Sequence, residues 1–333
     1  TRRPVAQPMA APLASPPDGD PERRGASGWA GPFREFGIDH LAVRALITGG
    51  GGQLASDLEA LLGDDARAYT HAQLDITDPA ALDRAFSRVR PEVVFNCAAF
   101  HNLDVCEAEP DRAWEVNARA VRDLAARGAK LVHLSTNYVF DGHREAPYGE
   151  DDLPAPRSIY ALTKLAGEHA ALAYGQGALV VRAAGLYGLH GSASKGGNFV
   201  QRMLTRASEG QPIKMVADQH LQPTFTADLA GALIDAVDRG AQGIVHLAAE
   251  GACSWHEFTV AIMELSGLDV DVEPVATTVA PGGVDRPLNG VLARGRTDAL
   301  GLPRLRPWRA ALQDYLARSE HTLAEAVRVR SGR

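Results

Sequence analysis

The feature that most constrains the fold is a run of four glycines between a buried apolar segment and an amphipathic one. Residues 43–48 are typical of a buried parallel strand, and leucines recur with helical spacing over 53–62. A strand, a tight glycine turn and a helix, in this order, bring backbone N–H groups and a helix N-terminus to a pyrophosphate. Glycine is needed where φ must be positive and where a side chain would block the phosphates. The run, which leads to Ala55, fits both Gly-x-Gly-x-x-Ala and Gly-x-x-Gly-x-x-Ala, so it predicts dinucleotide binding without fixing the pattern.

Apolar strands and amphipathic helices continue to alternate along the chain. Further strands are expected at 66–70, 92–97, 130–135, 178–182 and 243–248. Helices are expected at 53–62, 79–88, 110–127, 158–174 and 226–239. This alternation implies right-handed βαβ crossovers, and therefore an α/β fold with a Rossmann-like, doubly wound parallel sheet.

The domain organisation follows from changes in this pattern. Seven prolines within the first 40 residues interrupt any helix or strand, so a disordered tail is expected over 1–40. We expect a dinucleotide-binding domain over 41–184 and about 212–249. After Arg182 the pattern loosens, and a smaller interleaved α/β substrate-binding region is expected over about 185–211 and 250–320.

Composition excludes several classes of protein. The net charge of −7 argues against a nucleic-acid or anionic-membrane surface, and no apolar run has the length of a membrane span. Three scattered cysteines are too few for a disulfide framework, and no common metal-ligand spacing occurs. We therefore expect no metal site and a cytoplasmic location.

Tyr160 and Lys164 form the most informative pair of polar residues. They are four residues apart in a predicted helix, so their side chains share one face. An adjacent ammonium is expected to lower the pKa of the phenol, which would make Tyr160 a proton donor and acceptor for a carbonyl/alcohol pair. The chain has only four lysines, so this spacing is seldom met by accident.

Taken together, a series of ordered segments resembles the dTDP-4-dehydrorhamnose reductase family of the extended short-chain dehydrogenase/reductase superfamily. The match covers about residues 43–310. The segments that carry the resemblance are Gly52-Gln53-Leu54, 74–78, 91–99, Val116-Asn117-Ala118, 135–142, 160–168, 197–199, Asp218-Gln219 with Pro223-Thr224, 254–258 and 286–289.

The resemblance implies NADPH or NADH as cofactor and reduction of the 4-keto group of a nucleotide-activated deoxysugar to the 4-hydroxyl. The end of the second strand offers no acidic residue to a ribose 2′-hydroxyl, which permits NADPH without excluding NADH. The cofactor-binding residues implied are Gly49, Gly52, Gln53, Leu54, Asp75, Ile76, Ala98, Ala99, Phe100, Asn117, Tyr160 and Lys164.

The resemblance also implies a catalytic set and a sugar pocket. Thr136 would hydrogen-bond the carbonyl oxygen, Tyr160 would protonate it, and Lys164 would hold the nicotinamide ribose and lower the pKa of the phenol. The substrate-binding residues expected are His101, Asn137, Tyr138, Asn198, Gln219, Arg286 and Asn289. The resemblance allows a homodimer.

Four positions depart from the family's pattern and leave alternatives open. Asn137 stands where an Asp is usual, Gly185 where a Trp is usual, and Phe100-His101 where Tyr-Thr is usual. A non-catalytic regulatory subunit of the same fold and a nucleotide-sugar epimerase are therefore the alternative functions. A 4,6-dehydratase is excluded, because Asn137 and Tyr138 occupy the places of its Asp-Glu pair.

Overall fold

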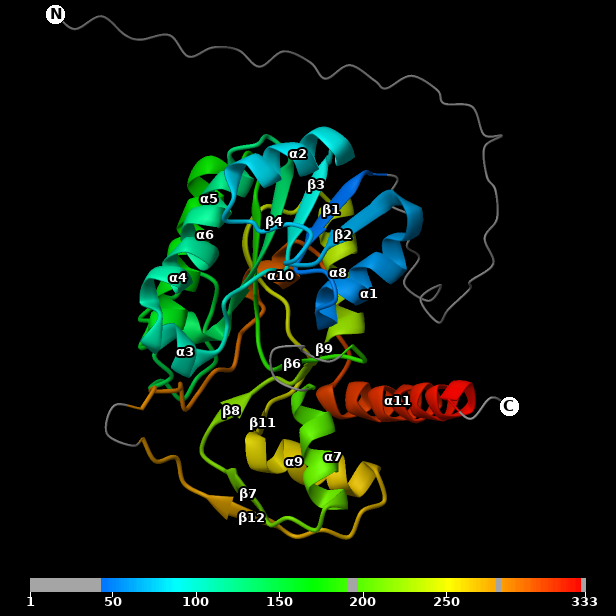
Figure 1. Ribbon diagram of the computed structural model, residues 1–333. Helices are drawn as coiled ribbons and strands as arrows, with labels where there is room; N and C mark the ends of the chain where they lie inside the picture. The colour runs from blue at the N-terminus through cyan, green and yellow to red at the C-terminus, as the bar shows by residue number, and fades with distance from the viewer. Residues whose placement is uncertain (1–42, 191–196, 280–282, 331–333) are drawn as a thin grey trace, which may run out of the picture. The chain divides into compact units, whose positions relative to one another are not determined.

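The computed structural model describes residues 43–190, 197–279 and 283–330, with side chains described as far as residue 319 (Figure 1). The predicted tail over residues 1–40 lies outside the described residues. No helix in the described part of the chain combines the length and the apolar character that a membrane span requires.

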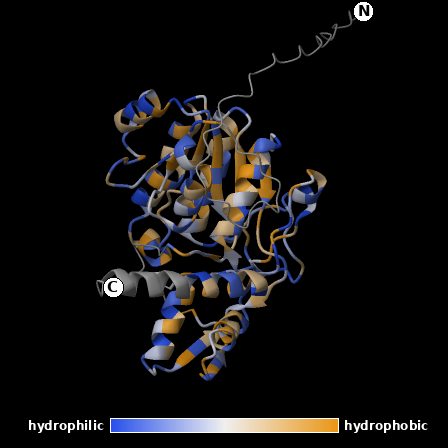
Figure 2. Ribbon diagram, turned by 90° about the vertical axis from the view of Figure 1, so that its right-hand side faces the viewer, coloured by the Kyte–Doolittle hydropathy of each residue, from blue (hydrophilic) through white to orange (hydrophobic). Residues whose placement is uncertain are grey.

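Among the described residues, six parallel strands form a central sheet with the order β10-β5-β4-β3-β1-β2 (Figure 1). The strands are β1 (Ala45–Thr48), β2 (Ala66–Tyr69), β3 (Val93–Asn96), β4 (Lys130–Thr136), β5 (Leu179–Ala183) and β10 (Gly243–His246). Each strand lies within a predicted range or within one residue of it. Figure 2 shows hydrophobic residues gathered on these strands, and β1, β3 and β5 are buried throughout. The doubly wound α/β fold is confirmed.

Helices cover both faces of the sheet. The helices α1 (Gln53–Leu62) and α8 (Thr226–Asp238) pack together on one face, while α2 (Pro79–Val89), α5 (Ala120–Ala125) and α6 (Ile159–Tyr174) cover the other (Figure 1). On the α6 side, side chains from these helices and from the strands between them form one continuous apolar cluster, which includes Leu46, Leu82, Val94, Val121, Leu131 and Ala171.

The helix predicted over 110–127 is interrupted. The chain forms α3 (Leu103–Ala108) and α4 (Pro110–Trp114), then one π-helical turn, η3 (Glu115–Arg119), and only then α5. A π turn inserts an extra residue into the helical ladder and is common near functional positions. Here the turn contains Asn117, which is buried and faces the start of α6.

Shorter elements form a second group. The strand β7 (Ile213–Val216) pairs with β12 (Val272–Val275), and β8 (His220–Leu221) pairs with β11 (Cys253–Ser254). Helices α7 (Phe199–Ser208) and α9 (Trp255–Leu265) pack beside these strands, as Figure 1 shows. Because β7 and β8 pair within this group, residues 213–221 belong with it and not with the sheet, which differs from the boundary expected near residue 212.

Four further elements connect the second group with the sheet or pack against one of the two. The strand β6 (Leu186–Tyr187) pairs with β9 (Thr224–Phe225), which leads directly into α8. The helix α10 (Gly295–Ala299) contacts β10, and α11 (Trp308–Arg330) begins against β9 and α9. These pairings return the chain from the second group of elements to the sheet.

Candidate active site

The four-glycine turn after β1 allows very close backbone contacts. A Cβ atom on Gly49 would lie 2.9 Å from the nitrogen of Ala98, one on Gly50 would lie 2.7 Å from the carbonyl carbon of Tyr69, and one on Gly52 would lie 2.9 Å from the oxygen of Gly49. Gly49 and Gly51 also have positive φ angles of 76° and 75°. Glycine is therefore required at all four positions, for steric or for conformational reasons.

This turn opens helix α1 in the way that a bound phosphate requires. Gly52 is the N-cap and provides no side-chain hydrogen bond, so the first N–H groups of α1 are available to an anion. The side-chain oxygen of Gln53 is buried without a partner among the described residues. Sheet order reverses between β1 and β3, and crevices of this kind bind dinucleotides. These residues fit a dinucleotide cofactor.

The loop after β3 forms the opposite side of this crevice. Asn117 holds the loop with two 2.9 Å hydrogen bonds, from Phe100 N to its Oδ1 and from its Nδ2 to Phe100 O. The guanidinium of Arg112 lies 4.9 Å from the centre of the Phe100 ring. The ring of His101 contacts the oxygen of Ala99, with 3.3 Å between Nδ1 and that oxygen. Asn117 therefore orders the loop that is predicted to bind the cofactor, and its own contact with the cofactor stays a prediction.

Of the neighbouring residues Asp75 and Ile76, the first faces solvent and the second lies in the core. Asp75 is exposed, and its carboxylate accepts hydrogen bonds from the backbone and hydroxyl of Thr77, which lower its pKa. Ile76 belongs to the apolar cluster under α2 and α5. A contact between this pair and an adenine stays a prediction.

Tyr160 lies in the first turn of α6, which Ser158 caps by accepting a hydrogen bond from Ala161 N. Burial raises the pKa of the Tyr160 hydroxyl above its ordinary range, and a side-chain hydrogen bond with Thr136 opposes that shift. Thr136 is the last residue of β4, so the two hydroxyls meet at the carboxyl edge of the sheet. The structure thus brings together two of the three predicted catalytic residues.

Lys164 directs its ammonium into the sheet. Its Nζ donates to the oxygen of Leu134 at 2.5 Å and lies 3.2 Å from Nε2 of His133. Burial lowers the pKa of Lys164 to about 8, against the opposing charge of Glu168. Lys164 does not offset the burial of the phenol here, so the prediction that it lowers the pKa of Tyr160 is wrong for this structure. The physical reason is that β4, not Tyr160, accepts its hydrogen bonds.

Asn137 explains one departure from the family's pattern. Its amide Nδ2 donates to the oxygen of Gly290 at 3.0 Å, which a carboxylate could not do. A Cβ atom on Gly290 would lie 2.1 Å from that nitrogen, so only glycine permits the contact. Tyr138 presents its ring edge-on to Tyr160, with centroids 6.0 Å apart. Asn137 therefore lies beside the Thr136 hydroxyl and Tyr138 beside the Tyr160 ring, and their contact with a sugar stays a prediction.

A second departure from the family's pattern, Gly185, also has a structural reason. Its φ is +55°, and a Cβ atom would lie 2.7 Å from Cδ1 of Leu221 and 3.2 Å from the Cα of Pro223. A tryptophan at this position would be strained and would collide with the segment around β8. The backbone at this corner therefore requires glycine.

Three of the remaining predicted substrate residues have hydrogen-bond partners within the chain. Asn198 is buried and caps α7, and its Nδ2 donates to Gly188 O and contacts the Tyr315 hydroxyl. Gln219 donates to Thr277 Oγ1 at 3.0 Å, and Asn289 donates to the backbone of residues 144–146. Arg286 is exposed and lies close enough to Tyr138 to lower the pKa of its hydroxyl against the effect of burial. Their sugar contacts stay predictions.

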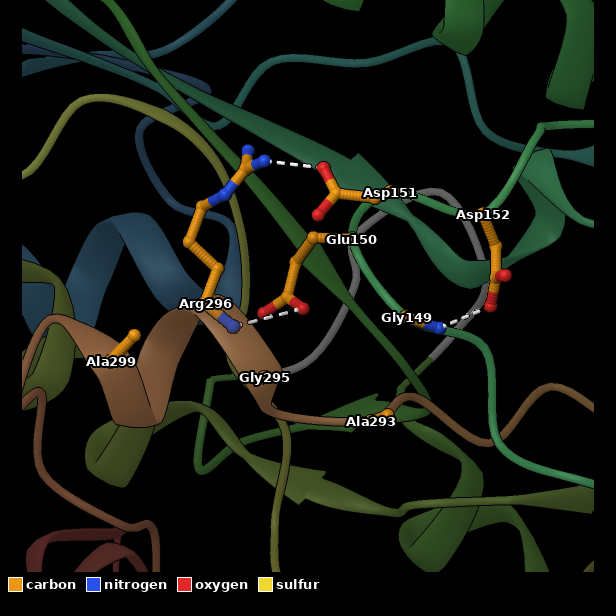
Figure 3. Close-up of a pocket in the computed structure, with 8 residues that line it drawn as sticks. All are labelled: Gly149, Glu150, Asp151, Asp152, Ala293, Gly295, Arg296 and Ala299. Atoms are coloured by element: carbon orange, nitrogen blue, oxygen red, sulfur yellow. Dashed lines mark hydrogen bonds and ion pairs between the residues drawn. The ribbon is translucent and has the colours of Figure 1, made fainter.

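A separate pocket lies beside α10 and not beside the Tyr160 hydroxyl. Figure 3 shows its lining, in which Arg296 reaches Asp151 at 2.5 Å and Asp152 accepts from Gly149 N at 2.6 Å. Its polar groups are thus satisfied by one another. Among the described residues, no group of three or more His, Cys, Asp and Glu side chains could hold a metal ion.

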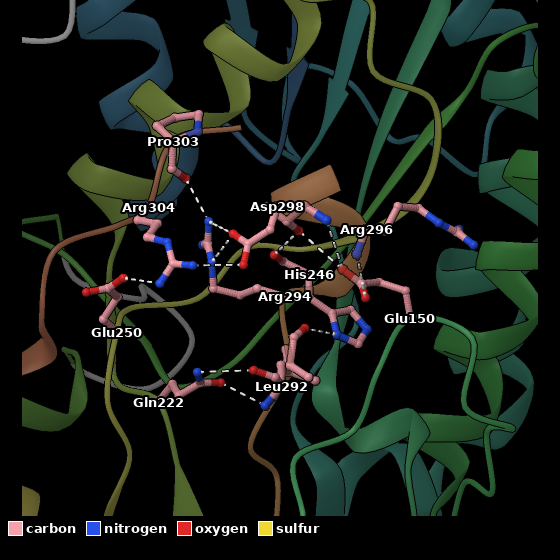
Figure 4. A network of polar contacts seen from close by, with 12 residues as sticks. Glu150, Gln222, His246, Glu250, Leu292, Arg294, Arg296, Asp298, Pro303 and Arg304 are labelled. Atoms are coloured by element: carbon pink, nitrogen blue, oxygen red, sulfur yellow. Dashed lines mark hydrogen bonds and ion pairs between the residues drawn. The ribbon is translucent and has the colours of Figure 1, made fainter. Parts of the chain in front are cut away.

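Polar contacts anchor the segment that carries Gly290 to the sheet (Figure 4). Nδ1 of His246 donates to Ala293 O at 2.9 Å, and the side chain of Gln222 bonds both backbone groups of Leu292. Glu150 accepts from the backbone of Arg296 at 3.2 Å. This network fixes residues 289–298, and with them the oxygen that accepts from Asn137.

Several residues that shape the site were not predicted. His133 and Asn96 lie under α6 on the sheet, and Glu168 pairs with the buried guanidinium of Arg182 at 2.7 Å. Gly167 lets α6 approach η3, since a Cβ atom there would lie 2.2 Å from Asn117 O. Two features of the sequence could have indicated these residues. Glu168 follows Lys164 by four residues in the same predicted helix, so the two share a face. Asn96 and His133 are polar residues inside apolar strands, and a buried polar side chain needs a hydrogen-bond partner.

The sheet, the glycine turn at its switch point, and the Thr136, Tyr160 and Lys164 side chains beside it define a dinucleotide-binding protein of the short-chain dehydrogenase type. Comparison with known proteins narrows this class. The family model described as "RmlD substrate binding domain" matches residues 43–321. The chain therefore belongs to that family.

Relatives with curated names support this family assignment. The chain is 41% identical to a dTDP-4-dehydrorhamnose reductase of Mycolicibacterium smegmatis, over 87% of this chain and 91% of that one. It is 38% identical to the spore coat polysaccharide biosynthesis protein SpsK of Bacillus subtilis, over 82% and 97%. A crystal structure of dTDP-4-dehydrorhamnose reductase from Bacillus anthracis in complex with NADP matches with a TM-score of 0.79 and 32% identity, covering 84% of this chain and 100% of that one.

Proposed function

We propose that this protein reduces the 4-keto group of a dTDP-activated 6-deoxysugar to the 4-hydroxyl with NADPH or NADH. The observation that carries the proposal is the meeting of the Tyr160 and Thr136 hydroxyls at the carboxyl edge of the sheet, in a chain whose named relatives include dTDP-sugar ketoreductases. When bound, the nicotinamide cofactor supplies the hydride that reduces the sugar carbonyl.

The roles of the protein's own residues follow from their protonation. Because burial raises the pKa of Tyr160, the phenol keeps its proton at neutral pH and can give it to the oxygen that gains negative charge. Thr136 hydrogen-bonds the same oxygen, and a donor aimed at developing charge stabilises the transition state by about 3 kcal/mol. Lys164 retains an N–H group beyond those directed at β4, and we assign that group to the cofactor ribose.

The cofactor site comprises the glycine turn and the loop after β3. Gly49, Gly52, Gln53 and Leu54 would surround the pyrophosphate, and the segment from Ala98 to Phe100 would line the cleft. Support comes from the N-terminus of α1, where Gly52 provides no side-chain cap and the first N–H groups can donate to a phosphate. We further propose that the sugar nucleotide lies between the edge of the sheet and the second group of elements, near Asn137, Tyr138, His101 and Arg286.

The proposed setting of the enzyme is the cytoplasm. In the described part of the chain, Cys97, Cys106 and Cys253 form no disulfide bond, as suits a reducing compartment. A homodimer that binds no nucleic acid is the assembly we propose. We propose that the chain is divided into a dinucleotide-binding domain and an interleaved substrate-binding region.

A substrate panel tests the function. Purified protein is mixed with NADPH or NADH and with 4-keto-6-deoxy sugars carrying dTDP, UDP or GDP, and loss of the reduced cofactor's absorbance is followed. Turnover with a dTDP sugar, and its loss in Tyr160→Phe, is expected. If no sugar of the panel is reduced by a protein that still binds the cofactor, the proposed function is wrong.

A further inference from the structure

A row of buried polar side chains runs across the sheet to Lys164. The strand register aligns Thr48 of β1, Asn96 of β3 and His133 of β4. The hydroxyl of Thr48 lies 2.6 Å from Asn96 Oδ1, and Asn96 Nδ2 lies 3.0 Å from His133 Nδ1. All three side chains are buried, with 0–1% of each residue exposed. The row continues from His133 Nε2 to Lys164 Nζ at 3.2 Å.

The charge state of Lys164 fixes the direction of every hydrogen bond in this row. An ammonium group has three donors and no acceptor, so a charged Lys164 requires an unprotonated Nε2 on His133. The ring proton then lies on Nδ1 and must be accepted by the amide oxygen of Asn96. The two ends of an amide are interchangeable in shape, and the Asn96 amide can turn to present either one. In the structure the Asn96 nitrogen faces His133 and its oxygen accepts from Thr48, so a charged lysine requires the amide to be turned, with its oxygen towards His133 and its nitrogen towards the Thr48 hydroxyl.

We propose that His133, oriented by Asn96, is the positioning residue for Lys164: its Nε2 accepts a hydrogen bond from Nζ and stabilises the ammonium form. Leu134 O, which accepts from the same nitrogen at 2.5 Å, fixes a second N–H group. The third N–H group is left for the cofactor ribose. Only this last role rests on the proposed reductase function.

Close packing of α6 on the sheet makes this contact possible. A Cβ atom on Gly167 would lie 3.1 Å from His133 Nε2 and 2.2 Å from Asn117 O. One turn before Gly167, the Lys164 side chain enters the same narrow space. Glycine at 167 therefore sets the distance between the lysine and the imidazole.

The other ionisable groups around Lys164 are less suited to this role. Burial lowers the pKa of Lys164, while Glu168 on α6 and Cys97 after β3 act in the opposite direction. Glu168 is already paired with Arg182 and accepts from Ser135 Oγ. Burial raises the pKa of the Cys97 thiol to about 12, so it is uncharged at neutral pH. His133, by contrast, places a ring nitrogen within hydrogen-bond distance of Nζ.

The test reads the titration of Lys164 directly. The chain has only four lysines, so protein labelled with ¹³C at lysine Cε gives few NMR signals, and Lys164→Met identifies the one that matters. In the wild-type protein the midpoint is expected near 8. His133→Leu should lower it by roughly one pH unit, since a hydrogen bond to a charged group is lost. His133→Gln, which retains an acceptor, should restore it, and His169→Gln on the exposed side of α6 is the matched control.

A second measurement needs no substitution and covers the case in which His133→Leu does not fold. In wild-type protein labelled with ¹⁵N-histidine, the His133 ring should carry its proton on Nδ1 below the Lys164 midpoint. A proton on Nε2 throughout that range would overturn the proposal, and so would an unchanged Lys164 midpoint in folded His133→Leu. Neither measurement uses a sugar, so a failure of the proposed reductase function would leave this test intact.

Kinetics then shows whether the contact serves catalysis. In the proposed function the charged form of Lys164 donates to the cofactor ribose, so kcat should fall as pH rises through the Lys164 midpoint and that form is lost. That alkaline limb should move to lower pH in His133→Leu and return in His133→Gln. A purely structural role would change kcat equally at every pH, and that result would contradict the positioning role.

Discussion

Tyr160 and Lys164 share a helical face, yet their polar groups reach different partners. The phenol meets Thr136 at the edge of the sheet, whereas the ammonium enters the sheet and reaches Leu134 O and His133. Spacing along a helix fixes which face a side chain occupies, but a long flexible lysine chooses its acceptor from whatever packs against that face.

Tyr160→Phe tests the proton donor. The change removes the hydroxyl and keeps the ring, so kcat should fall by about 10² to 10⁴ while cofactor affinity changes little. Steady-state kinetics with the substrate found in the panel gives kcat, and calorimetry gives the affinity. Thr136→Ala is the comparison and should lose less, because it orients the carbonyl and supplies no proton. Near-full turnover by Tyr160→Phe would refute the assignment.

Asn137→Asp tests the amide contact with Gly290. A carboxylate would face the carbonyl oxygen without a proton to donate, and leaving buried polar groups unpaired costs about 1–3 kcal/mol in the free energy of unfolding. Denaturant unfolding measures the loss. Asn102→Asp is the matched control, because the Asn102 side chain accepts from Val105 N and a carboxylate accepts equally well. Equal stability of the two variants would show that the Asn137 contact contributes nothing.

At the scale of elements, the site depends on how closely α6 and the glycine turn approach their neighbours. Gly167 brings α6 against η3, and Gly49 brings the turn against the loop after β3. Both contacts join segments that are distant in the sequence. Added volume at Gly167 or within the glycine turn should therefore disturb the site.

Gly167→Ala should destabilise the protein although alanine favours helices. The added methyl group would lie 2.2 Å from Asn117 O, and overpacking of this kind costs about 1–3 kcal/mol. Gly231→Ala in α8 is the matched control, because a Cβ atom there would meet nothing within 4 Å and alanine should stabilise that helix by about 0.5–1 kcal/mol. Thermal or denaturant unfolding compares them, and opposite signs are expected.

Gly52→Val should abolish binding of NADPH and NADH. Its Cβ atom would lie 2.9 Å from Gly49 O, and the side chain would occupy the space over the first turn of α1. Calorimetry on the folded variant measures the affinity, with Gly231→Ala as a protein expected to bind normally. Unchanged affinity in Gly52→Val would place the cofactor elsewhere.

For the molecule as a whole, buried histidines should make stability depend on pH. Burial lowers the pKa of His246 from 6.5 to about 4, although Glu150 opposes the shift. Between these values the unfolded chain binds a proton that the folded chain does not, so the free energy of unfolding falls as the pH drops through this range. The shift corresponds to a loss of up to about 3 kcal/mol from this residue.

His246→Asn isolates that contribution. Asparagine can still donate to Ala293 O but does not titrate, so the variant should lose less stability than the wild type between pH 7 and about 4.5. Denaturant unfolding at each pH gives the comparison. Parallel pH profiles for the two proteins would contradict a buried neutral histidine.

Local sequence patterns determined the order of the secondary-structure elements and part of the candidate site. The order of strands and helices, the glycine turn and the Tyr160–Lys164 spacing follow from side-chain periodicity and the steric freedom of glycine, which act over a few residues. The sequence did not reveal the π turn at Asn117. Its residues have the same helical composition as their neighbours, and only the hydrogen-bond pattern changes.

Only the tertiary structure decided how the polar groups pair. Strand register aligned Thr48, Asn96 and His133, and the close approach of α6 brought Lys164 to the end of that row. The contact between Asn137 and Gly290 joins residues 153 positions apart. Sequence spacing carries no record of such pairs, because they depend on which strands become neighbours and on the space left between packed elements.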